Sequence, residues 1–105
     1  MESEKQIQNE IIRQYGTRPD LRIWRANTGV ADMGGRTVAF GLPGQADLSG
    51  ILMDGRRLEI EVKSATGTLS ERQRQFRDMI ERFNGVYIVA RCVEDVRKAL
   101  AEEGY

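Results

Sequence analysis

The stretch from 46 to 64 restricts the fold more than any other part of the chain, because two segments of alternating apolar and polar residues flank the pair Asp54-Gly55. Asp-Gly between such segments is a strong signal for a tight β-hairpin turn. The two predicted strands are ADLSGILM (46–53) and RRLEIEVKS (56–64). In the second strand the apolar positions are Leu58, Ile60 and Val62, and the polar positions are Glu59, Glu61 and Lys63. The polar face of this strand then either meets water or holds a site.

The rest of the chain alternates between helical periodicity and strand-like runs. Ser3 with Gln6, and Ser70 with Gln73, have the spacing of a capping box that begins a helix. The glycine-rich segment 29–35 is predicted as a loop. Predicted helices cover 2–15, 70–84 and 93–104, and further predicted strands cover 21–28, 36–44 and 86–90, the last buried on both faces. Without the short strand of 36–44, which runs into a Gly-Pro loop, the order α-β-β-β-α-β-α predicts an α/β (α+β) fold in which helices flank a mixed central sheet.

The composition excludes several kinds of chemistry. A single cysteine, Cys92, cannot form a disulfide within the chain, and the lack of histidine nearly excludes zinc sites of thiolate or imidazole and any histidine base. The 16 basic and 16 acidic residues balance, which argues mildly against tight nonspecific nucleic-acid binding. One domain, 1–105, is expected. No apolar run approaches the ~20 residues of a membrane span, and the N-terminus lacks a signal-peptide pattern, so a cytoplasmic protein without membrane contact is expected.

The predicted hairpin brings acidic residues from two strands together. Reflection about its turn places Glu61 opposite Leu48, one residue from Asp47, and a bulge or a longer turn would close that offset. Lys63 lies on the same face, roughly 6.5–7 Å further along the strand. Two neighbouring carboxylates repel each other unless a cation lies between them, and Mg²⁺ prefers oxygen ligands. The alternative is an ordinary solvated strand face with cross-strand pairs.

The segments around this hairpin resemble a known family. FGLPGQADLSGIL and GRRLEIEVKSATGTLSERQRQF are similar to the VRR-NUC nucleases, a branch of the PD-(D/E)XK superfamily. EKQIQNEII resembles their opening helix, RANTG their second motif, and VYIVARCVEDVRKAL their closing strand and helix. The resemblance implies a restriction-endonuclease-like core and a phosphodiester hydrolase that needs Mg²⁺ or Mn²⁺ and no small-molecule cofactor. By the same resemblance, Asp47, Glu61 and the backbone carbonyl of Val62 bind metal, and Lys63 is the catalytic lysine.

The family also places a glutamate of the first helix near the metal, and Glu4 and Glu10 compete for that role. Ile7, Ile11 and Tyr15 define the apolar face of the predicted helix. At about 100° per residue, Glu4 shares the direction of this face, whereas Glu10 lies roughly 100° away. Glu4 is therefore favoured as the metal ligand, with Glu10 as the alternative.

Gln73 has two predicted roles. It would cap the helix that begins at Ser70, and its place in LSERQ resembles a glutamine beside the family's site, so both roles can coexist. Predicted substrate contacts are Arg72 and Arg74, which can pair with phosphate, Asn27, which lies beside a glycine-rich loop, and Gln8, on the inward side of the first helix. Trp24 is predicted to be core rather than a base-stacking platform, and Cys92 is predicted to be a small buried hydrophobe.

These features together predict a metal-dependent DNA endonuclease. Because one active site cuts one strand and a domain of this size offers little surface to DNA, we expect a homodimer that acts on branched DNA such as a four-way junction. Stand-alone relatives resemble junction-resolving nucleases, so a role in DNA repair in a bacterial or phage-infected cell is expected. The alternative is a nuclease-like module that binds nucleic acid or a partner protein without cleavage. A restriction-type enzyme that reads duplex sequence is a less favoured third interpretation.

Overall fold

A computed structural model describes residues 2–26 and 29–105 of the chain. Within these residues it forms an α+β fold with three helices and a mixed sheet. The helices are α1 (Glu4–Tyr15), α2 (Glu71–Arg82) and α3 (Val93–Glu102). The strands are β1 (Leu21–Arg25), β2 (Gly29–Met33), β3 (Arg36–Phe40), β4 (Leu48–Leu52), β5 (Arg57–Val62) and β6 (Val86–Ala90). The predicted order α-β-β-β-α-β-α is therefore too short, because five strands separate α1 from α2.

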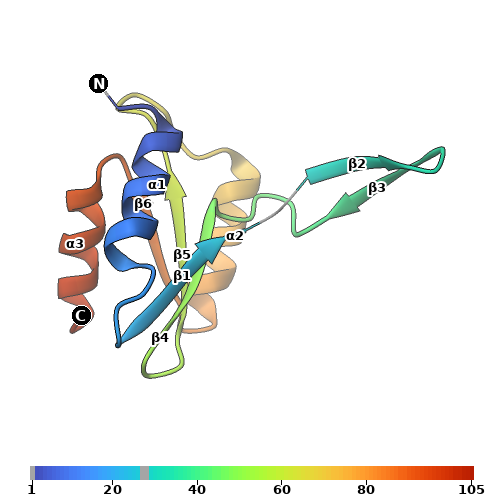
Figure 1. Cartoon of the computed structure of the whole chain (residues 1–105). Coiled ribbons are helices and arrows are strands. Elements are labelled where there is room, and N and C mark those ends of the chain that lie inside the picture. Colours follow the sequence, from blue (N-terminus) through green and yellow to red (C-terminus); the bar gives the residue numbers. More distant parts are fainter. Residues whose placement is uncertain (1, 27–28) are drawn as a thin grey trace.

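The central sheet has the order β1-β4-β5-β6. β4 is antiparallel to both β1 and β5, whereas β5 and β6 are parallel. The parallel pair requires a crossover, which α2 supplies on one face of the sheet (Figure 1). The mixed sheet predicted from the sequence is thus present, and its interior strands are the two strands of the predicted hairpin.

The main core lies between the sheet and the layer formed by α1 and α3 (Figure 1). Its buried members from these two helices are Ile7, Ile11, Tyr15, Val96 and Leu100. Leu58, Ile60 and Val62 of β5 are fully buried against them. A smaller cluster of Ala46, Phe76 and Ile80 packs α2 on the opposite face. No helix of the described residues is both long and apolar enough to cross a membrane.

The β4–β5 turn settles the offset that the sequence left open. Leu48 pairs with Ile60, one residue earlier than simple reflection predicts. The turn is longer than two residues, because the Leu52 N–H donates to the Arg56 carbonyl, 3.0 Å away, at its base. This longer turn brings Asp47 level with Glu61, as the second of the sequence alternatives required.

The prediction of a loop over 29–35 is wrong. β2 and β3 form an antiparallel hairpin that stands apart from the main sheet (Figure 1). Its turn is Gly34-Gly35, with φ of +61° and +80°. Positive φ at both central positions belongs to the turn type that matches strand twist, and glycine adopts it without a steric penalty. The glycines therefore mark a turn between strands rather than an irregular segment.

Three burial predictions also differ from the structure. Trp24 is 46% exposed rather than core, because it lies on the face of β1 opposite to the buried Leu21 and Ile23. Cys92 is exposed, since it is the residue that precedes α3 at the surface. β6 is buried on one face only; Tyr87 on its second face is half-buried beneath α2, with its ring against Phe76.

Candidate active site

Asp47 and Glu61 lie side by side where β4 begins and β5 ends. The register carries Asp47 to the level of Glu61, and the Val62 N–H donates a 2.9 Å hydrogen bond to Asp47 Oδ2. On the other side, the Ala26 N–H donates to the Asp47 carbonyl at 3.0 Å. The backbone of both neighbouring strands therefore fixes this half-buried carboxylate in place.

Glu61 is almost completely withdrawn from water, at 4% exposure. Gln73 Nε2 donates to Glu61 Oε2 at 3.2 Å, and Lys63 Nζ lies 3.8 Å from the same oxygen. Lys63 is itself largely covered, with a side chain 17% exposed. The other oxygen, Oε1, is buried and has no hydrogen-bond partner among the residues that the structure describes. A buried carboxylate oxygen without a partner is costly, so this atom is suited to bind something the chain itself does not supply.

The electrostatics of Asp47 and Glu61 also favour the binding of a cation. Burial, with the neighbouring Asp47 carboxyl as the second cause, raises the pKa of Glu61 to about 8, while the Lys63 ammonium acts in the opposite direction. Near neutral pH the Glu61 carboxyl of the free site thus keeps its proton. A divalent cation in the place of that proton would let Glu61 ionise.

Gln73 performs both of its predicted roles at once. Its backbone N–H donates to Ser70 Oγ at 3.2 Å, and its Oε1 accepts from the Ser70 N–H at 2.9 Å, which completes the capping box of α2. Because the amide oxygen is committed to the cap, the amide nitrogen is the end that faces Glu61. The capping box at the start of α2 therefore determines that Gln73 contacts Glu61 through its amide nitrogen and not through its amide oxygen.

The loop before β4 approaches the same helix end closely. Gly44 has φ of +77°, and a Cβ at this position would lie 2.3 Å from the Arg72 carbonyl oxygen and 2.9 Å from the Gln73 nitrogen. Only glycine leaves room for the loop to pack this tightly on the α2 backbone. This contact connects the segment that carries Asp47 to the residue that touches Glu61.

The two candidate glutamates of α1 have different partners. Glu4 Oε2 accepts a 3.1 Å hydrogen bond from the Ser64 N–H, one residue beyond Lys63. Glu10 instead bonds to Arg13 and Gln14 of its own helix, and these contacts lower its pKa. Glu4 is therefore the helix carboxylate at the site's edge. In residues 2–26 and 29–105, however, no three Asp, Glu, His or Cys side chains lie close enough together to hold one metal ion.

The remaining predicted site residues lie outside this cluster or beyond the described residues. Gln8 Oε1 accepts from Arg25 at 2.8 Å, which commits it to β1. Arg74 donates to the Leu69 carbonyl at 2.8 Å, next to the cap of α2, and Arg72 is exposed one residue before Gln73. Asn27 lies outside the described residues. Val62 contributes its N–H to Asp47, and the role predicted for its carbonyl stays a prediction.

Glu59 is the polar residue whose position the sequence did not reveal. It is 1% exposed, so the alternative of a solvated strand face is wrong for both glutamates of β5. Arg57 Nε donates to Glu59 Oε1 at 3.3 Å, and burial raises the pKa of this carboxyl. The signal was present in α2, whose apolar residues Phe76 and Ile80 had to cover one face of the sheet. A crossover between β5 and β6 places the helix over that face.

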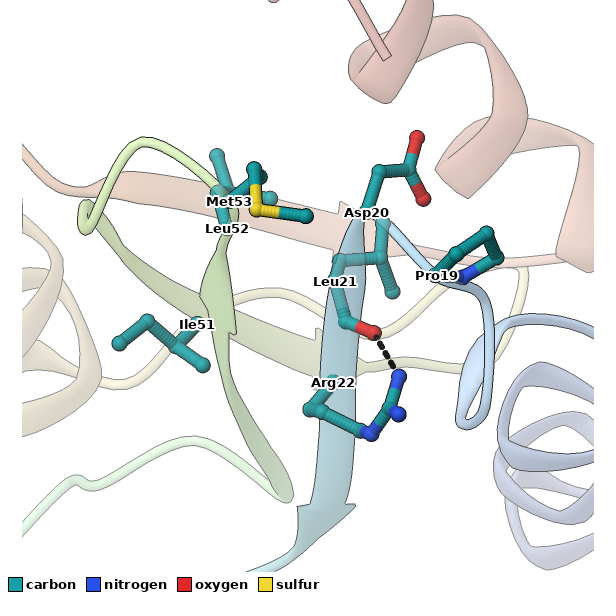
Figure 2. Close-up of a pocket in the computed structure, with 7 residues that line it drawn as sticks. All are labelled: Pro19, Asp20, Leu21, Arg22, Ile51, Leu52 and Met53. Atoms are coloured by element: carbon teal, nitrogen blue, oxygen red, sulfur yellow. Dashed lines mark hydrogen bonds between the residues drawn. The ribbon is translucent and has the colours of Figure 1, made fainter.

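A surface hollow of about 330 Å³ lies at the other end of β1 and β4 (Figure 2). The residues that line it are Pro19, Asp20, Leu21, Arg22, Ile51, Leu52 and Met53. None of the predicted catalytic residues is among them. The acidic cluster therefore lies at the opposite strand ends and is not part of this hollow.

Comparisons of the chain with family models, with curated proteins and with solved structures find no match.

Proposed function

We propose that the chain is a divalent-cation-dependent DNA endonuclease of the VRR-NUC type, with a restriction-endonuclease-like core. The observation that carries the proposal is the convergence of Asp47, Glu61, Lys63 and Gln73 on one point, with Gln73 Nε2 and Lys63 Nζ both directed at Glu61 Oε2. Two carboxylates, a partly covered lysine and an amide are a sufficient set for metal-assisted phosphodiester hydrolysis without histidine.

The donor set fits a hard cation. Asp47 and Glu61 offer carboxylate oxygens, one of which is buried without a partner in the described part of the chain. Such oxygens suit Mg²⁺ or Mn²⁺. We propose that Asp47, Glu61 and the Val62 carbonyl hold the ion, with Glu4 at the edge of the site. When bound, the ion would neutralise the paired carboxylates and lower the pKa of a coordinated water.

The residues around the pair have distinct tasks in this proposal. The Lys63 ammonium offers positive charge to the phosphate oxygens as negative charge develops on them. Gln73 keeps Glu61 oriented through its amide nitrogen, while the cap at Ser70 prevents that amide from turning over. Asp47 is held by the Val62 N–H, so its geometry does not depend on the substrate. Preorganised groups of this kind need little rearrangement during the reaction.

The proposed substrate is branched DNA, and the proposed active species is a homodimer. One site of this kind cleaves one strand, so the cutting of both strands of a junction needs two copies. Sedimentation at micromolar concentration tests this part directly. A monomer would overturn the proposed dimer, and equal cleavage of linear duplex and four-way DNA would overturn the structural preference.

The activity is tested with a panel of linear, flapped and four-way DNA in Mg²⁺ or Mn²⁺. We expect Asp47→Asn and Lys63→Met to reduce the cleavage rate by about 100-fold or more, because each removes a group that contacts the metal or the reacting phosphate. Matched controls are Asp54→Asn in the β4–β5 turn and Lys98→Met on α3, both remote from the site, which should cleave normally. Circular dichroism verifies that the variants fold.

Two results would contradict the proposal. The first is near-normal cleavage by Asp47→Asn or Lys63→Met. The second is a folded wild-type chain that binds DNA but neither cleaves any member of the panel nor binds Mg²⁺ or Mn²⁺ in a calorimetric titration. That second result would favour a non-catalytic binding module.

A further inference from the structure

The edge strand β1 presents one large aromatic side chain to solvent on the same sheet face as the acidic cluster. Trp24 pairs with Ser49, and Ser49 pairs with Glu59, so their side chains share a face. Asp47 lies on this face as well, because it precedes Ser49 by two residues. An exposed tryptophan on the face that carries the proposed site is unusual enough to need a reason, since burial would remove a large apolar area from water.

The distance from Trp24 to the acidic cluster suits a nucleic-acid strand. The hydrogen bond from the Ala26 N–H to the Asp47 carbonyl continues the β1–β4 pairing beyond the strand ends. Trp24 is then a diagonal neighbour of Asp47, at a Cα separation of roughly 7–8 Å. That separation equals about two base steps of a stacked strand at roughly 3.4 Å each. A strand with a phosphate at Asp47 would thus bring a nearby base to the indole ring.

The charges beside Trp24 suit a polyanion. Arg22 donates to the backbone carbonyls of Arg18 and Leu21, and Arg25 donates to the side-chain oxygens of Gln8 and Asn9. Among the described residues, neither arginine forms an ion pair with a carboxylate. Arg22 lies two residues from Trp24 on the same face, so its uncompensated positive charge beside the indole favours phosphate, whereas Arg25 lies on the opposite face, toward α1.

The exposed face of β1 and β4 extends from Trp24 away from the acidic cluster. Arg22 pairs with Ile51 in the next cross-strand position, and both residues line the hollow shown in Figure 2. Ile51 is 45% exposed. The face of β1 and β4 that α2 leaves uncovered thus runs from the acidic cluster, past the indole, to an open hollow edged by an arginine.

From these observations we infer that Trp24 is a stacking platform for an unpaired base of the DNA strand whose phosphate lies at Asp47 and Glu61, and that Arg22 binds a phosphate beside it. A base can stack on the indole only when it has left the duplex. Trp24 therefore selects strands with unpaired nucleotides near the cut, which is a property of flaps and junctions. This inference rests on the proposed function.

A second copy of the chain is the alternative partner for the exposed surface around Trp24. In a two-fold contact the same patch meets itself, so the Arg22 side chains of both copies would enter one interface. Like charges placed opposite each other destabilise such a contact. The charge pattern around Trp24 consequently favours a nucleic-acid strand.

The test uses the fact that Trp24 is the only tryptophan of the chain. The full chain is kept in EDTA, so that no cleavage occurs, and is titrated with a blunt duplex or with the same duplex carrying a single-stranded flap. We expect the flap to quench Trp24 fluorescence and the blunt duplex to leave it nearly unchanged. An abasic nucleotide placed next to the flap junction should remove the quenching.

Anisotropy with labelled DNA gives the affinity in parallel. Trp24→Ala should weaken flap binding about tenfold, as expected for one stacked base, and leave blunt-duplex binding unchanged, while Trp24→Phe retains most of the affinity. The matched controls are Phe83→Ala, another exposed aromatic, and Arg97→Gln, an arginine paired with Glu94 on α3; both should bind the flap normally.

Failures of the inference and of the function are distinguishable. Saturated flap binding without quenching, or equal flap affinity of Trp24→Ala and the wild type, overturns the inference even if the protein cleaves DNA. Fluorescence that changes with protein concentration, together with loss of a dimer in Trp24→Ala, assigns the face to a second copy and also overturns it. Quenching that depends on the flap in a protein without cleavage supports the inference and refutes the proposed function.

Discussion

One face of β5 is apolar and the other is acidic, yet both faces are buried to nearly the same degree. Leu58, Ile60 and Val62 are fully covered by the α1–α3 layer, whereas Glu59 and Glu61 are covered by α2. Burial of the first set contributes to stability in proportion to the apolar area removed from water. Burial of the second set costs free energy, because carboxyl groups lose hydration and keep unpartnered oxygens within the described structure. One strand thus carries both the stability of the fold and the chemistry of the proposed site.

The largest loss of stability is expected from a substitution on the apolar face of β5. Ile60→Ala should lower the free energy of unfolding by about 2–5 kcal/mol, because it leaves a cavity in the fully packed layer under α1 and α3. Urea denaturation followed by circular dichroism measures the loss. The matched control is Ile51→Ala in the adjacent strand, where the half-exposed side chain should cost less than about 1 kcal/mol. Equal losses for the two variants would contradict the assignment of the faces.

A smaller effect is expected where the α2 layer meets the loop before β4. Gly44→Ala should destabilise the protein by about 1–2 kcal/mol for the left-handed backbone alone, and by more because the new methyl group meets the α2 backbone at Arg72. Gly55→Ala is the matched control, since Gly55 also has a positive φ but nothing lies within 4 Å of an added Cβ. If the two variants lost the same stability, the close approach at Gly44 would not matter. Cleavage should fall only in Gly44→Ala, because displacement of the loop separates Asp47 from Gln73.

The apolar face and the capped helices were predictable because they depend on local signals. Alternation in LEIEV, the turn at Asp54-Gly55 and the two capping boxes each act over a few residues, and the structure confirms the strand, the place of the turn and both caps, although the turn is longer than two residues. The proximity of Asp47 to Glu61 was predicted, but whether a bulge or a longer turn produces it stayed open, since one extra turn residue decides the register. A single-residue shift of this kind moves every side chain to the other face.

The cover over Glu59 and Glu61 was harder to predict because it is a tertiary event. No residue pattern within β5 predicts that a helix twelve residues long will lie across its polar side. The exposure of Trp24 has the same origin, since α2 covers β5 and β6 but leaves β1 open. The hairpin of β2 and β3 was missed for a local reason: its glycine pair was interpreted as a mark of irregular chain instead of a tight turn.

The smallest expected effect, counted per pH unit, concerns the charge on the polar face, measured in metal-free protein. Folded Glu61 keeps its proton up to a pKa of about 8, whereas an unfolded glutamate loses it near 4.5. The folded state therefore binds more protons between these values, and its stability falls as pH rises from 4.5 to 8, by at most about 1.4 kcal/mol per pH unit for one group.

Glu61→Gln cannot titrate, so its free energy of unfolding should vary less between pH 6 and 8. Glu10→Gln is the control, because the pKa of Glu10 is lowered and its titration lies below this window. Urea denaturation in EDTA at pH 6, 7 and 8 measures the three slopes. A slope in Glu61→Gln as steep as in the wild type would show that burial under α2 imposes no charge penalty at Glu61, and the two faces of β5 would then differ in composition but not in energetic cost.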